Sequence, residues 1–214
     1  MKLECLTVGQ FQENCYLYWD EKSQNGLIID PGDEADRIIE TVNEIGFKAT
    51  AILLTHGHCD HIGALEAVKN KWNLPVYIGL GEESYLSDSK LNGSAFFDNP
   101  IEAPKPDFLV EDEYLYSFDS IDLRVLSTPG HTLAGVCYLD EKEGILFCGD
   151  TLFQGSIGRT DLPGGSFEKL IESIQKKILT LPDNIVCFPG HGTATTVGAE
   201  RTGNPFLVGK NRYA

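Results

Sequence analysis

The sequence predicts an α/β fold in which helices cover the faces of β-sheets, as a single domain over residues 1–214. Strand-like apolar runs alternate with segments whose apolar residues recur at helical spacing. A chain of 214 residues is long enough to bury a sizeable core. It carries neither a low-complexity linker nor an internal repeat that can be aligned, so we expect one domain.

The first half of the chain is expected to form strands around one amphipathic helix. Strands are predicted over residues 2–8, 14–19 and 26–30. The helix should begin at Asp33 or Glu34 and end at Gly46, because the apolar residues between them recur at helical spacing. The fully apolar run at 51–55 is typical of a buried strand, and it leads directly into the sequence THGHCDH.

The second half returns to strands after one helix. A helix is predicted over 62–72, a strand over 74–78, and a short helix with an exposed loop over 79–106. Further strands are predicted over 113–118, 121–130, 135–150 (a hairpin that turns at DEKEG) and 184–190. Ser166 is the predicted N-cap of a helix that stops before Pro182.

The acidic composition limits the partners that the protein can bind. A formal net charge of −15 argues against binding through nucleic-acid phosphates or anionic lipids, so we expect no nucleic acid and no membrane partner. The N-terminal residues alternate like a strand and do not form a signal peptide. The six cysteines lack CxxC pairs and several lie in apolar runs, which favours reduced thiols and a cytoplasmic location. The oligomeric state is not indicated.

The run THGHCDH concentrates donors that divalent metal ions prefer. His56, His58, Asp60 and His61 offer imidazole nitrogens and a carboxylate on a loop that follows a buried strand. A lone histidine is more often structural, but four donors in six residues have no packing rationale. In an extended loop, the first three would point one way and His61 another, so one run could supply two adjacent ions.

The other histidines occur in matching contexts. His131 lies in STPGHT and His191 in FPGHGT, each after a strand and a Pro-Gly turn. Asp150 ends the strand LFCGD in the same manner. Glycine-containing turns at strand ends allow backbone and ligand to approach closely. All five histidines are therefore candidate ligands, which leaves none for another role.

With these residues in order, the chain resembles the metallo-β-lactamase superfamily, whose members carry HxHxDH and then a His, an Asp and a last His. The resemblance covers nearly the whole chain and implies a four-layer αβ/βα sandwich with the site at the sheet edges. It implies that the first metal is held by His56, His58 and His131, the second by Asp60, His61 and His191, and that Asp150 bridges them. Asp30, in LIIDPGD, would orient ligands without binding metal.

The resemblance also implies a reaction. Two divalent ions, zinc by default with iron or manganese as competitors, would activate a bridging hydroxide that attacks a carbonyl. Asp60 would orient this hydroxide. Covalent catalysis is disfavoured, because the chain has no GxSxG motif and no histidine remains to activate a cysteine.

Within the superfamily, two segments are similar to the glyoxalase II-like branch, in its short single-domain bacterial form. They are GSIGRTDLPGGS at 155–166 and FPGHGTATTVGAERTGNPFL at 188–207. The implied substrate is a small-molecule thioester such as S-lactoylglutathione, hydrolysed to acid and thiol. The helical domain that supplies much of the glutathione pocket in longer members is absent from the predicted domain. Arg159 is a candidate for binding a substrate carboxylate, and pairing with Asp161 is its structural alternative.

Other reactions remain open at this stage. Persulfide dioxygenases share an HxHxDH-like run but use a single iron, and a lactonase is also compatible with the ligands. The GHGTATT continuation after His191 favours the hydrolase. A β-lactamase of the commonest type would carry cysteine in place of Asp150, and Cys148 is expected in the core. A noncatalytic binding module is disfavoured because all seven ligands are present. Cys59 is interpreted as a spacer.

Overall fold

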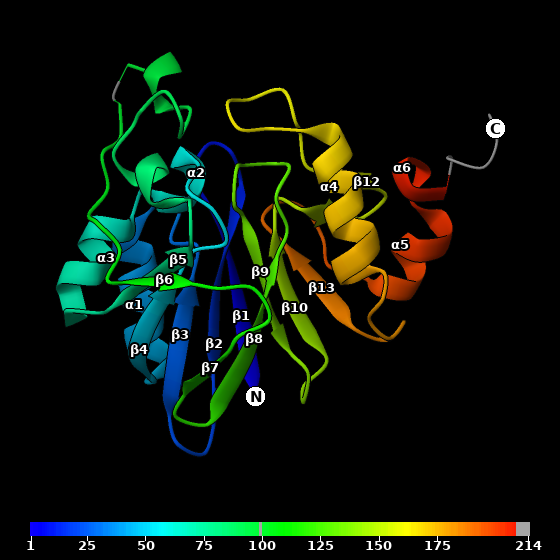
Figure 1. Cartoon of the computed structure of the whole chain (residues 1–214). Coiled ribbons are helices and arrows are strands. Elements are labelled where there is room, and N and C mark those ends of the chain that lie inside the picture. The colour runs from blue at the N-terminus through cyan, green and yellow to red at the C-terminus, as the bar shows by residue number, and fades with distance from the viewer. Residues whose placement is uncertain (99, 209–214) are drawn as a thin grey trace.

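Two six-stranded β-sheets pack face to face, and helices cover their outer faces, which confirms the predicted αβ/βα sandwich (Figure 1). The structure is a computed structural model that describes residues 1–98 and 100–208. All strands of the first sheet precede those of the second along the chain. Each sheet is therefore built from one contiguous half of the sequence.

The first sheet uses the N-terminal half. In pairing order, its strands are β1 (Lys2–Val8), β2 (Glu13–Trp19), β3 (Asn25–Ile29), β4 (Lys48–Leu53), β5 (Val76–Gly79) and β6 (Phe108–Val110). The β1, β2 and β3 strands are antiparallel, whereas β3 to β6 run parallel. Parallel neighbours require crossover connections, and these contain the helices α1 (Ala35–Ile45), α2 (Cys59–Ile62) and α3 (Leu65–Trp72).

The second sheet uses the C-terminal half. In pairing order, its strands are β14 (Thr195–Thr196), β13 (Val186–Pro189), β10 (Ile145–Gly149), β9 (Val136–Asp140), β8 (Ile121–Ser127) and β7 (Leu115–Phe118). A separate ribbon pairs β11 (Leu152–Phe153) with β12 (Ser156–Ile157). The helices of this half are α4 (Phe167–Ser173), α5 (Val197–Gly203) and α6 (Pro205–Val208). The crossover through α4 makes β13 parallel to β10.

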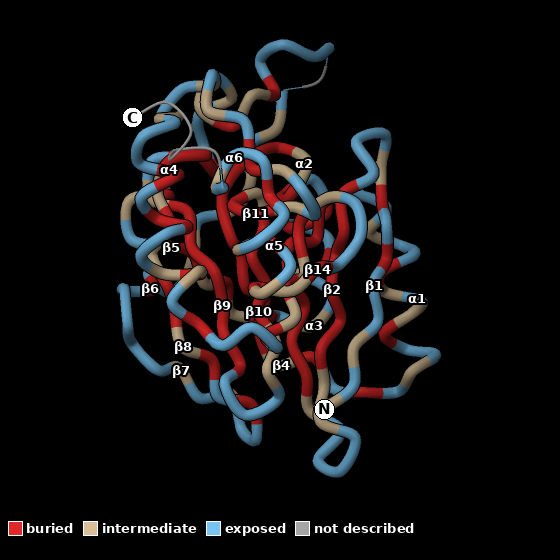
Figure 2. The backbone as a smooth tube through the Cα atoms, turned by 90° about the vertical axis from the view of Figure 1, so that its right-hand side faces the viewer, coloured by how far each residue is buried: buried red, intermediate tan, exposed pale blue. Residues whose placement is uncertain are grey.

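Alternation along the strands divides the core into layers. On β2, Cys15 and Leu17 face the α1 and α3 side, whereas Tyr16 and Tyr18 face the second sheet. Because both faces of the central strands are covered, β9 is buried throughout and β2 as far as Tyr18, and Figure 2 shows these strands mainly in red. The first sheet therefore contributes to two hydrophobic layers, one beneath its helices and one between the sheets.

Buried tyrosine hydroxyls join the two sheets. Tyr16 donates to the Pro189 carbonyl over 2.6 Å, and Tyr138 donates to the Leu54 carbonyl over 3.0 Å. Both carbonyls lie where a strand of the other sheet ends. A buried hydroxyl needs a partner, so these bonds fix the offset of the sheets as well as satisfying the groups.

Local signals set several helix ends, but three predicted segments differ in the structure, and α5, α6 and the β11–β12 ribbon were not predicted. Gly46, at φ +85°, closes α1, and the Ser166 hydroxyl accepts the Lys169 N–H at the start of α4. The helix expected over 62–72 is two helices, and the first begins earlier, at Cys59.

The long helix expected after Ser166 changes to a π-helical turn over Ile174–Ile178. The segment 79–106, expected as an exposed loop with a short helix, forms two 3₁₀ turns, over Glu83–Leu86 and Ser94–Phe96. It also buries Tyr85 and Asn92. Within the described residues, no helix is both long and apolar enough to cross a bilayer.

Replacing Phe147 by alanine should lower the free energy of unfolding by about 3–5 kcal/mol, because the ring fills the layer between the sheets. Its centroid lies 5.3 Å from that of Tyr18 and 5.5 Å from that of Tyr16. Denaturant titration of the purified variant measures the loss. Leu115→Ala, at a position that is 55% exposed, is the control and should change stability by less than about 1 kcal/mol. Equal losses for both variants would contradict this description of the core.

Candidate metal centre

The seven predicted ligands converge at one edge of the sandwich, where strands of both sheets end. His56 and His58 follow β4, whereas His131 follows β8. Asp150 comes directly after β10, and His191 two residues after β13. Parallel β10 and β13 present their carboxyl ends at the same edge, beside the loop that carries α2 (Figure 1). The topology alone therefore places donors from distant parts of the chain together.

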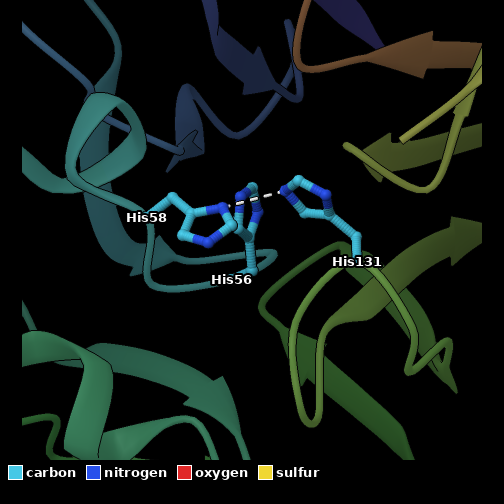
Figure 3. Close-up of side chains that lie close together, drawn as sticks. All are labelled: His56, His58 and His131. Carbon is cyan, nitrogen blue, oxygen red and sulfur yellow. Dashed lines mark hydrogen bonds between the residues drawn. The ribbon is translucent and has the colours of Figure 1, made fainter. Parts of the chain in front are cut away.

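Three buried histidines form the first donor cluster (His56, His58 and His131), with one ring nitrogen of each within 4.8 Å of the others. Figure 3 shows the three rings pointing toward one another from two separate loops. The Nδ1 atom of His58 lies 2.9 Å from Nε2 of His131. The Nδ1 atom of His131 lies 2.8 Å from the Arg159 carbonyl, which directs its Nε2 into the cluster.

The first cluster favours neutral imidazoles, the form that binds metal. Burial lowers the pKa of His56 well below its usual range, and the nearby histidines lower it further. Burial and the facing His131 likewise lower the pKa of His58 to about 3. The Nε2 atoms of His56 and His58 are buried without a hydrogen-bond partner. Unpaired buried nitrogens are costly, and a bound cation would satisfy them.

Asp60, His61 and His191 form the second donor cluster. The His191 Nε2 atom lies 3.2 Å from Oδ2 of Asp60, and His191 Nδ1 lies 3.1 Å from the Phe11 carbonyl. The extended loop that we expected through residue 60 is wrong, because α2 begins at Cys59 and the His61 N–H bonds to the His58 carbonyl over 3.0 Å. A helical turn, rather than strand parity, therefore separates His61 from His56 and His58.

Asp150 lies between the two clusters. Its Oδ2 is 3.5 Å from His131 Nε2 and 3.6 Å from His191 Nε2, and its Oδ1 is 3.4 Å from His61 Nε2. Burial alone would raise the pKa of Asp150, but His61 and the other facing histidines hold it well below its usual range. The carboxylate is therefore ionised and in reach of both clusters. Gly190 permits this approach, because a Cβ there would lie 2.3 Å from Asp150 Oδ1.

Asp30 supports the second cluster from behind. Its Oδ2 lies 3.1 Å from His61 Nδ1, on the side of the ring that faces away from Asp150. Its Oδ1 and Oδ2 also accept the backbone N–H and the hydroxyl of Thr55 over 2.7 and 2.6 Å. A carboxylate in this position orients the imidazole and makes its Nε2 a stronger ligand for a metal ion. The division of ligands between two ions and the role of Asp30 remain predictions.

Three polar residues that the sequence analysis did not select also shape the site. The Asn14 amide donates to the carbonyls of Pro189 and Gly192, which flank His191. Glu13 is 1% exposed, and neither carboxylate oxygen has a hydrogen-bond partner. Burial raises its pKa well above the usual range. Both residues lie inside β2 without a recognisable motif, so only the tertiary structure reveals them.

The third of these residues, Glu82, joins the two ligand loops. It is fully buried, and its Oε2 accepts the Gly57 N–H over 3.2 Å, between His56 and His58. Its Oε1 accepts the Ala134 N–H over 2.7 Å, in the loop that carries His131. One carboxylate therefore holds the loops of both sheets at a fixed distance around the first cluster. Glu82 lies in the segment 79–106, for which a short helix and an exposed loop were predicted but no functional residue.

The remaining selected residues lie around the cluster. Arg159 lines the cavity in front of it, but its Nε and Nη2 both donate to Asp161, over 2.8 and 2.9 Å. Cys59 is buried, and burial with the adjacent Asp60 raises its pKa to about 11, so the thiol is protonated at neutral pH. Cys148 is fully buried and donates to the Leu152 carbonyl.

Replacing Glu82 by alanine should weaken metal binding by about 10–100-fold, because the two backbone N–H groups lose the acceptor that sets the loop spacing. Titration of the metal-free protein against a chromophoric chelator measures this affinity. The control is Glu83→Ala, since Glu83 is not buried and accepts only from the neighbouring Gly81. An unchanged metal affinity in Glu82→Ala, with the fold intact by circular dichroism, would show that the two hydrogen bonds of Glu82 are not needed for metal binding.

Known proteins resemble the chain over nearly its whole length. Residues 8–191 match the family model of the metallo-beta-lactamase superfamily. Hydroxyacylglutathione hydrolase GloC of Haemophilus influenzae is 40% identical, over 99% of this chain and 100% of that protein. A crystal structure of BLEG-1 B3 metallo-beta-lactamase superposes with a TM-score of 0.93 at 41% identity, over 97% and 100% of the two chains. A crystal structure of TTHA1623 in a di-iron-bound form superposes with a TM-score of 0.86 at 35% identity, over 95% of this chain and 100% of that chain. The chain therefore belongs to the metallo-β-lactamase superfamily.

Proposed function

We propose that this protein is a hydrolase that uses two divalent metal ions to cleave a thioester, such as S-lactoylglutathione, to an acid and a thiol. The observation that carries the proposal is the position of Asp150, whose carboxylate lies within 3.6 Å of histidines from both donor clusters. A site for a single ion would not need a carboxylate that lies close to both donor clusters. The Nε2 atoms of His56, His58 and His61 are buried without a hydrogen-bond partner, which supports the same conclusion.

Two ions held in this way would supply hydroxide near neutral pH and polarise a carbonyl. The chain's own residues would complete the site. Asp60 is partly exposed to the cavity and is ordered by its contact with His191, so it is placed to accept a hydrogen bond from an attacking water. The ligand histidines are oriented from behind, His61 by Asp30 and His131 by the Arg159 carbonyl. No other nucleophile is needed.

The similar proteins support this proposal in different ways. GloC is named for hydroxyacylglutathione hydrolysis, which is thioester cleavage. TTHA1623 holds two irons on a similar chain, so iron competes with zinc as the resident metal. BLEG-1 is described as a β-lactamase, and a lactone or β-lactam is therefore the alternative substrate class to assay. We further propose that residues 1–214 act as one hydrolase domain on small molecules in the cytoplasm, where the six free cysteines stay reduced.

Metal content should separate the hydrolase from an oxidative enzyme. We expect two ions per chain by mass spectrometry after loading with zinc, manganese or iron. Chelation should lower the melting temperature, because it removes a ligand that binds only the folded state. One iron per chain, together with rapid oxygen uptake in the presence of glutathione persulfide, would overturn the proposal in favour of a dioxygenase.

Replacing Asp60 by alanine should reduce thioester turnover by about 10²–10⁴-fold, because the group that orients the attacking water is lost. Loss of thioester absorbance measures the rate with S-lactoylglutathione, and acid release measures the rate with a lactone. Metal content is measured on the same samples, and Asp36→Ala, at an exposed position on α1, serves as the control. A variant with full metal content and wild-type turnover would rule out this role for Asp60.

A further inference from the structure

The metal centre opens into a cavity of about 740 Å³ whose walls are largely apolar. The wall residues that are neither polar nor predicted ligands are Phe11, Phe96, Phe97, Phe153, Ile157 and Leu162, together with Gly93. Phe11 is 43% exposed, Phe97 44% and Phe96 74%. Large aromatic side chains left exposed beside a reactive centre indicate a surface that is covered when a ligand binds.

A second cavity of about 490 Å³ adjoins the first. The two share Phe11, Cys59, Asp60, Phe96 and Phe97 as lining residues. The rings of Phe11 and Phe97 meet edge to face, with centroids 5.4 Å apart. This aromatic pair therefore stands between the two cavities, and a group that extends from the metal centre toward the second cavity must pass along it.

The charged groups around these cavities do not suit a ligand with free carboxylates. Asp33 and Asp98 line the second cavity and carry no basic partner there. Among the residues that the structure describes, Arg159 is the one basic side chain, besides the predicted histidine ligands, that lines either cavity. Both of its donor contacts go to Asp161. Away from the metal centre, a carboxylate that enters would meet like charges, and no free guanidinium or ammonium of the described residues lies there to neutralise it.

We infer that the site prefers substrates whose non-reacting arm is apolar or aromatic and free of carboxylates, and that this arm lies against Phe11, Phe96 and Phe97. The inference rests on the proposed function for the identity of the cleaved bond only. The occupant follows from continuity with the metal centre, since the cavity that holds the aromatic wall is lined by His58, Asp60, His131, Asp150 and His191. Glutathione carries two carboxylates, so S-lactoylglutathione would be cleaved less efficiently than a thioester whose thiol arm is apolar and uncharged.

The test uses ligands that cannot be hydrolysed, so that its outcome does not depend on turnover. Four thioethers are compared by calorimetry on the zinc-loaded protein: S-methylglutathione, S-benzylglutathione, and the same two compounds with both carboxylates converted to primary amides. The benzyl compounds should bind at least about tenfold more tightly than the methyl compounds, because an apolar group enters an apolar pocket. The bisamides should bind more tightly than the diacids, by a factor that shrinks as salt screens the acidic groups.

Single substitutions test which residues cause these differences in affinity. Phe97→Ala should bring the benzyl-to-methyl affinity ratio close to one, whereas Phe108→Ala should retain it, since Phe108 is 51% exposed but lines neither cavity. Arg159→Gln should leave the amide-to-acid ratio unchanged. Tighter binding of the diacids, lost in Arg159→Gln, would overturn the inference, and so would equal affinity of the wild-type protein for methyl and benzyl compounds. Absence of thioester turnover, with these affinity ratios intact, would instead contradict the proposed function alone.

Discussion

The metal centre depends on one constraint, the fixed offset of the two sheets at the edge where β4, β10 and β13 end. Each sheet contributes only part of the donor set, so neither cluster exists if the sheets slide. Tyr16 and Tyr138 fix the offset from inside the core, and Glu82 fixes it beside the ligand loops. All three are buried, and a buried hydrogen bond to the other sheet is lost entirely by a shift of a few ångströms.

This constraint explains why so many buried polar groups are tolerated at the site. Five histidines and several carboxylates lie together, and many of them are almost inaccessible to water. The mixture shifts protonation in opposite directions: burial lowers the pKa of His56, whereas Asp30 and Asp150 outweigh burial and raise that of His61. A bound metal ion would suit both histidines, because its positive charge replaces the proton that the carboxylates favour on His61 and it binds the lone pair of the neutral His56.

Much of the fold could be predicted from the sequence because its signals are local. Apolar runs, Pro-Gly turns, the Ser166 cap and Gly46 identify strands and helix ends without knowledge of the tertiary structure. The family resemblance added the layer order. The start of α2 could not be predicted, since four residues make no helical pattern and Cys59 is held by a bond from its N–H to the distant Asn92 carbonyl. Glu82 could not be selected either, because the N–H groups that it accepts from, those of Gly57 and Ala134, are distant from it in the sequence.

The order of the strands along the chain has a consequence for folding. Every strand-to-strand ladder of the first sheet closes within the N-terminal half and every ladder of the second within the C-terminal half, and only short contacts such as the Glu13–His191 bridge join the halves through the backbone of the described residues. Each sheet can therefore gain hydrogen bonds before the halves meet, whereas the donor clusters join residues from both and form only on docking. During synthesis the run THGHCDH leaves the ribosome well before His131, Asp150 and His191. Until those residues emerge, the run offers only part of each predicted ligand set. The complete metal sites can therefore form only after nearly the whole chain has been synthesised.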